Sequence, residues 1–66
     1  MTIADIDYEL GEILLSDGSR WQVEPDGLVM LGTWLPMNRI DITENASGAI
    51  LHNLDRRSAV QASGVD

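Results

Sequence analysis

The order of apolar and polar residues on either side of Asp17-Gly18 predicts a β-hairpin. This dipeptide is a turn signal, and residues that favour strands flank it on both sides. A three-residue loop with a left-handed glycine pairs Ile13 with Trp21 and places the apolar side chains on one face. A two-residue loop would instead place Glu12 among the apolar side chains. The three-residue loop is therefore favoured.

Short β segments and turn residues continue to alternate along the rest of the chain, about every ten positions. Strands are expected over residues 28–34, 39–44, 49–54 and 58–62, the first of them bent at Gly32. This spacing favours an all-β fold, a small five-stranded antiparallel barrel whose closure protects the strand edges. The barrel is expected to span residues 11–62, between an acidic N-terminal arm at 1–10 and a frayed C-terminus at 63–66.

Several of these motifs occur together in a known group of proteins. They comprise the turn Asp17-Gly18-Ser19, the corner Trp34-Leu35-Pro36, the run Leu51-His52-Asn53, and the apolar positions Ile13, Leu15, Trp21, Val23, Ile40 and Ile42. Over residues 11–62 the chain resembles small bacterial SH3-like β-barrel proteins of uncharacterised function. The resemblance implies a fold and no activity. The chain departs from the group because its Asp55-Arg56-Arg57 turn lacks a glycine and because it shows no export signal.

Length and composition exclude several kinds of site. A chain of 66 residues forms at most one domain and buries only about 60% of its unfolded surface, which favours partners or oligomers. The absence of cysteine excludes disulfides, thiolate catalysis and zinc ribbons, and a single histidine excludes a multi-histidine metal centre. No catalytic residue, metal or cofactor is therefore predicted. The apolar runs are too short for a membrane span, and no secretory signal is visible, so we expect a cytoplasmic protein.

The formal net charge of −7 shapes the choice of partner. Carboxylates repel phosphate backbones and anionic lipids, so neither nucleic acid nor a membrane is expected as a direct ligand, whereas a basic protein is. Four carboxylates without any base lie in the first twelve residues: Asp5, Asp7, Glu9 and Glu12. Their spacing begins like a calcium loop, but Leu10 and Ser16 stand where that motif needs glycine and glutamate. We expect a solvated acidic arm or a partner-docking segment.

The remaining candidates are better explained by structural roles. His52 is expected on the surface, and Asn53 is expected to bond backbone groups beside a turn rather than a ligand. Trp21, Trp34 and Tyr8 could form an aromatic cage for a methylated cation, but a core this small needs the tryptophans as filler. Trp34 is expected to fill the core as well, with part of its indole exposed at an irregular corner next to Gly32 and Pro36.

Together these features predict a non-enzymatic protein-interaction module that works as a homodimer or binds another protein, and the negative charge favours a basic partner. Its surface would combine an apolar patch with an acidic border. The candidate interaction residues are Asp5, Asp7, Glu9, Glu12, Leu14, Leu31, Trp34, Leu35 and Met37. The alternative function is an acidic inhibitor or nucleic-acid mimic that occupies the basic groove of a nucleic-acid-binding protein. An enzyme that pairs His52 with a nearby carboxylate is disfavoured.

Overall fold

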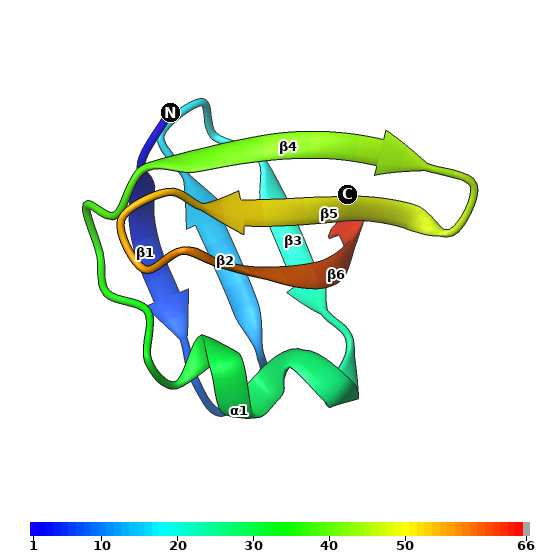
Figure 1. Ribbon diagram of the computed structural model, residues 1–66, viewed down its shortest axis with the longest axis horizontal. Helices are drawn as coiled ribbons and strands as arrows, with labels where there is room; N and C mark the ends of the chain where they lie inside the picture. The colour runs from blue at the N-terminus through cyan, green and yellow to red at the C-terminus, as the bar shows by residue number, and fades with distance from the viewer. Residues whose placement is uncertain (66) are drawn as a thin grey trace.

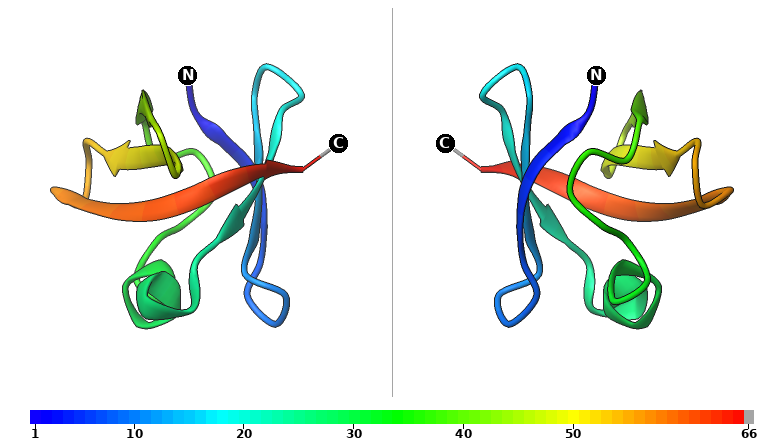
Figure 2. Two further views of the ribbon diagram at one scale, coloured as in Figure 1. Left: turned by 90° about the vertical axis from the view of Figure 1, so that its right-hand side faces the viewer. Right: turned by 90° about the vertical axis from the view of Figure 1, so that its left-hand side faces the viewer.

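Antiparallel hairpins build the sheet of the computed structural model, which describes residues 1–65 (Figure 1). Within these residues the sheet has six strands in the order β1-β2-β3-β6-β5-β4. The strands are β1 (Ile3–Asp7), β2 (Glu12–Leu15), β3 (Arg20–Val23), β4 (Ile40–Asn45), β5 (Gly48–Asn53) and β6 (Ser58–Val65). The prediction of an antiparallel β protein is confirmed. Two three-stranded meanders, β1–β3 and β4–β6, join through the β3–β6 pair and cross each other steeply (Figure 2).

The predicted five-stranded closed barrel is wrong, because the strands form an open sheet with β1 and β4 at its edges. The two edges meet at one end through a bridge between Thr2 and Arg39. Beside this bridge, the Ile3 amide donates to the Asn38 carbonyl at 3.0 Å. Among residues 1–65 this bridge is the one β-pairing outside the named strands, so the sheet bends towards closure without completing it.

The N-terminal segment 1–10 was predicted to be an arm outside the barrel, and it instead contributes the edge strand β1. Ile3 and Ile6 are both buried, although residues three apart in a regular strand face opposite sides. An irregularity in the β1–β2 register between Ile3 and Asp5 removes this conflict. The same irregularity explains why the apolar spacing of this segment fits a helix as well as a strand.

The C-terminus was predicted to be frayed over residues 63–66. Residues 63–65 instead belong to β6, where Ser63, Gly64 and Val65 pair with β3. Asp66 lies outside the described residues. The pairing with β3 fixes this end because it supplies backbone partners that a free terminus lacks.

The predicted β segment over 28–34 is replaced by two short helical turns, η1 (Pro25–Gly27) and α1 (Leu28–Leu31). Pro25 stands at the start of η1, where its fixed φ and missing N–H suit a helix. The run that follows has no polar alternation, and such a run does not distinguish a strand from a helix. The turns lie beyond the ends of β1, β2 and β3 in Figure 1.

The hairpin around Gly18 has the predicted three-residue loop. Gly18 has φ 87°, Ile13 pairs with Trp21, and the Leu15 amide donates to the Ser19 carbonyl at 2.9 Å. The turn between β5 and β6, Asp55-Arg56-Arg57, contains no glycine. Arg57 adopts the left-handed conformation in its place, with φ 53°. This conformation lets β5 and β6 pair without a glycine in their turn.

The core fills the space between the two meanders. Its buried apolar residues are Ile3, Ile6, Ile13, Leu15, Val23, Leu31, Trp34, Ile40, Leu51, Val60 and Ala62, and Trp21 and Ile42 pack against them partly buried. Trp34 is the largest fully buried side chain, and its Nε1 donates to Ser58 Oγ at 2.8 Å. The Tyr8 hydroxyl donates to the Trp34 carbonyl. These bonds attach the segment after α1 to both meanders.

Candidate interaction surface

Two of the predicted interaction residues, Leu31 and Trp34, belong to the core. Leu31 is 1% exposed and Trp34 is 0% exposed, so neither can contact a partner. Leu31 is the one buried residue of α1 and anchors that turn to the sheet. The predicted core role of Trp34 is confirmed, and the expected exposure of part of its indole is wrong. The burial of Trp34 also removes the aromatic cage, since its ring presents no open face.

Three other predicted apolar residues are exposed, as expected. Leu14 lies on β2, whereas Leu35 and Met37 lie in the loop between α1 and β4. Asn38 Oδ1 accepts the Leu35 amide and the Asn53 side-chain amide, each at 3.0 Å, and so fixes this loop against the β5–β6 turn. The predicted set therefore divides between two elements of the fold.

A further group of exposed apolar side chains was missed by sequence reasoning. It comprises Leu10, Leu28, Val29 and Met30, which we call the α1 patch, and Val29 is 88% exposed. Leu28 lies directly over Gly11, because its Cδ2 is 2.5 Å from where a Gly11 Cβ would stand. The signal that could have revealed the patch is the unbroken apolar run Leu28–Leu31, since a single short turn cannot bury every side chain.

Carboxylates border the α1 patch. Glu9 precedes Leu10, and Glu24 and Asp26 lie just before α1; all three are exposed. Glu24 and Asp26 line a hollow of about 390 Å³ between η1 and β6. This hollow includes Gly27, the residue that precedes Leu28 of the α1 patch in sequence.

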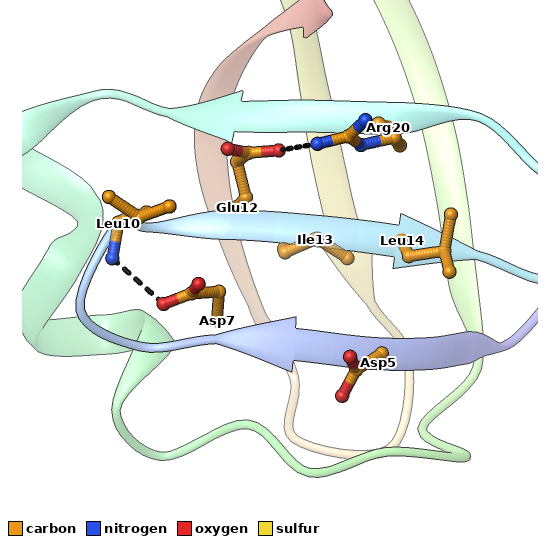
Figure 3. A pocket seen from close by; sticks show the side chains of 7 residues that line it. All are labelled: Asp5, Asp7, Leu10, Glu12, Ile13, Leu14 and Arg20. Carbon is orange, nitrogen blue, oxygen red and sulfur yellow. Dashed lines mark hydrogen bonds and ion pairs between the residues drawn. The ribbon is translucent and has the colours of Figure 1, made fainter.

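A second hollow, of about 380 Å³, lies on the outer face of β1, β2 and β3 (Figure 3). It shares Leu10 with the α1 patch and also contains Asp5, Asp7, Glu12, Ile13, Leu14 and Arg20. Glu12 accepts a hydrogen bond from Arg20 at 2.8 Å, and Asp7 accepts the Leu10 amide at 3.0 Å. Within this hollow Arg20 is the one base facing three carboxylates, so the surface keeps a negative charge.

The polar residues of β5 and its turn have structural roles. Asn53 is 1% exposed, and its Oδ1 accepts the backbone amides of Asp55 at 3.1 Å and Arg56 at 2.9 Å. This confirms its predicted role beside a turn. His52 is half-buried and pairs in register with Asp41 on β4. In the part of the chain that the structure describes, no group of three His, Cys, Asp or Glu side chains could hold a metal ion.

The ion pair between Arg39 and Asp55 gives a pH-dependent prediction. Hydrogen bonds from the Arg39 side chain and backbone hold the pKa of Asp55 below its usual value of 3.8. Because the folded pKa is lower than the unfolded one, the pair stabilises the fold above pH 3.8, and this stabilisation disappears as the pH falls through the lowered value. Arg39→Ala is expected to raise the pKa of Asp55 in an NMR titration.

Asp17 is the internal control for this titration. Its pKa is also lowered, but by hydrogen bonds from Ser19. The pKa of Asp17 should therefore be the same in the wild-type protein and in the Arg39→Ala variant. Ser19→Ala should raise the pKa of Asp17 and leave that of Asp55 unchanged. A parallel shift of both carboxyls in Arg39→Ala would indicate partial unfolding instead of a lost ion pair.

The α1 patch thus shares Leu10 with the hollow on β1, β2 and β3, and follows Gly27 of the other hollow in sequence. No helix within residues 1–65 is long and apolar enough to cross a membrane. Comparison of the chain with protein-family models, with curated proteins and with solved structures found no match.

Proposed function

We propose that the protein is a non-enzymatic interaction module whose α1 patch binds a basic protein partner. The observation that carries this proposal is the 88% exposure of Val29 between two further exposed apolar residues of α1. Contiguous apolar surface of this kind marks binding sites, because leaving it in water is unfavourable. The carboxylates at its border favour a basic partner and discourage acidic ones.

The SH3-like relationship is part of this proposal. It is supported by the steep crossing of the two meanders and by the Thr2–Arg39 bridge, which brings the sheet edges together at one end. On this interpretation the fold is an SH3-like sheet that stays open over most of its length. Such a scaffold would present α1 from a rigid support, since Leu31 and Trp34 anchor the C-terminal end of the exposed segment in the core.

The proposal is tested by replacing Val29 with serine and measuring binding of a short amphipathic peptide built from leucine and lysine. Burial of a valine side chain contributes about 1.5–3 kcal/mol, so calorimetry is expected to show binding that is about tenfold weaker or more. Met37→Ser is the matched control, because Met37 is 74% exposed but lies outside the patch. Equal losses in both variants, or none in either, would refute the assignment.

Self-association is distinguished by its response to salt. A twofold contact through the α1 patch would bring together Glu24 and Asp26 of both copies, so salt would strengthen it. Binding of a basic partner would weaken with salt. Light scattering over a concentration series at low and high salt is expected to show a monomer at low salt. A salt-resistant dimer that Val29→Ser dissociates would show that the patch is used by a second copy.

A second candidate function is the acidic inhibitor that imitates nucleic acid. It is favoured by the hollow in Figure 3, where Asp5 and Asp7 lie at alternate positions of β1. Alternate residues of a strand are about 7 Å apart along its axis. This spacing is similar to that of successive phosphates along a strand. Competition between this protein and DNA for a basic DNA-binding protein, lost on Asp5→Asn with Asp7→Asn and retained in Val29→Ser, would support it over the α1 patch.

A further inference from the structure

We propose that the outer edge of β4 accepts an extended basic segment of a partner protein as an added strand, which pairs with Ile42 and Glu44. This site is separate from the α1 patch. β4 ends the sheet order, and among the described strands it pairs with β5 alone. In Figure 1 it lies at the top of the molecule, with its outer edge turned away from the rest of the sheet.

The contacts of Ile40 reveal which backbone groups of β4 face outward. The Ile40 amide donates to the Met1 carbonyl at 2.8 Å, and the Met1 ammonium group donates to the Ile40 carbonyl at 3.5 Å. In an antiparallel strand the N–H and C=O of one residue point to the same side, and the side alternates along the chain. Ile42 and Glu44 therefore face the outer edge as Ile40 does, and Thr43 faces β5.

The open part of the edge is short and well defined. Met1 fills the position beside Ile40, so an added strand can begin only at Ile42. Within residues 1–65 the outward N–H and C=O groups of Ile42 and Glu44 have no protein partner. An incoming strand antiparallel to β4 would use both groups of both residues and would continue the pairing that Thr2 begins with Arg39.

Charge identifies the occupant. Asp41 and Glu44 on β4 are exposed, so the edge is acidic on both faces of the strand. Pairing with a second copy would bring four carboxylates together between chains that each carry −7. A basic strand instead places opposite charges across the new pair. The carboxylates thus protect this edge from copies of the same chain while favouring a basic segment.

The test uses a synthetic peptide that alternates arginine and valine, added to the full ¹⁵N-labelled chain. At a peptide concentration about ten times the dissociation constant, amide hydrogen exchange of Ile42 and Glu44 is expected to slow about tenfold. Thr43 should change little because its amide already faces β5. The same peptide methylated on every backbone nitrogen keeps its arginine charges but has no backbone N–H donor, so its binding is expected to weaken at least tenfold.

Two variants separate the backbone pairing from the charge. Glu44→Pro removes an outward donor, a substitution that edge strands tolerate, and is expected to abolish the protection of Ile42. Glu44→Gln keeps the donor and should weaken binding only at low salt. Equal binding of the methylated peptide would overturn the proposal, as would protection at Val29 instead of Ile42. Val29→Ser should leave the edge unaffected, so failure of this site and failure of the α1 patch are distinguishable.

Discussion

Replacement of Trp34 with alanine is expected to unfold most of the protein at room temperature. Trp34 is fully buried and is the largest side chain of the core, and removing such a residue costs about 3–5 kcal/mol. A domain of 66 residues has a total stability of only about 3–10 kcal/mol. The loss of Trp34 therefore removes much or all of the free energy of unfolding.

Urea denaturation followed by far-ultraviolet circular dichroism measures this effect. Trp21→Ala is the matched control. Because Trp21 is only partly buried, this substitution should lower the free energy of unfolding clearly less than Trp34→Ala does. Trp34→Phe keeps an aromatic ring but leaves Ser58 Oγ without its Nε1 donor. Its free energy of unfolding is therefore expected to lie between those of the wild type and Trp34→Ala. If the two alanine variants were equally stable, the central position of Trp34 in the core would be refuted.

Replacement of Gly48 with alanine is expected to destabilise the protein by about 3 kcal/mol. Gly48 has φ 132°, which is unfavourable for any residue with a side chain. In addition, a Cβ at this position would stand 2.5 Å from the Ala62 carbonyl oxygen of the neighbouring strand β6. Because the obstacle is backbone, the β5–β6 pair itself must separate to make room.

Two other glycines separate these causes in the same denaturation experiment. Gly18 has φ 87°, and a Cβ at this position would have no neighbouring atom within 4 Å, so Gly18→Ala should cost only about 1 kcal/mol. Gly64 has no positive φ, and its nearest neighbour is a Trp21 carbon at 3.9 Å, so Gly64→Ala should cost nothing. Equal losses for Gly18→Ala and Gly48→Ala would show that the close approach to Ala62 is unimportant.

The hairpin around Gly18 could be predicted because the chain offers one register that keeps Glu12 out of the core. β1 could not be predicted with the same certainty, because the irregularity after Ile3 gives its apolar residues a spacing that also suits a helix. The turn at Leu28–Leu31 escaped prediction for a different reason. A run without polar residues has no period, so its conformation depends on tertiary packing.

The candidate site was predictable only in its charged part. The charge of Asp5 and Asp7 predicted solvated side chains, and both residues are exposed. Which apolar residues belong to the site depends on which side chains pack against the rest of the protein after folding. Trp34 does so and Val29 does not, and nothing in their residue types distinguishes a buried apolar residue from an exposed one.

The order of the strands in the sheet has a consequence for synthesis of the chain on the ribosome. β6 is the last strand in sequence, yet it lies inside the sheet between β3 and β5. Until Ser58–Val65 has emerged from the exit tunnel, the nascent chain can form local hairpins but cannot join its two meanders. During that interval β3 and β5 each expose an unpaired edge, so the nascent chain is vulnerable to aggregation until Ser58–Val65 pairs with both strands.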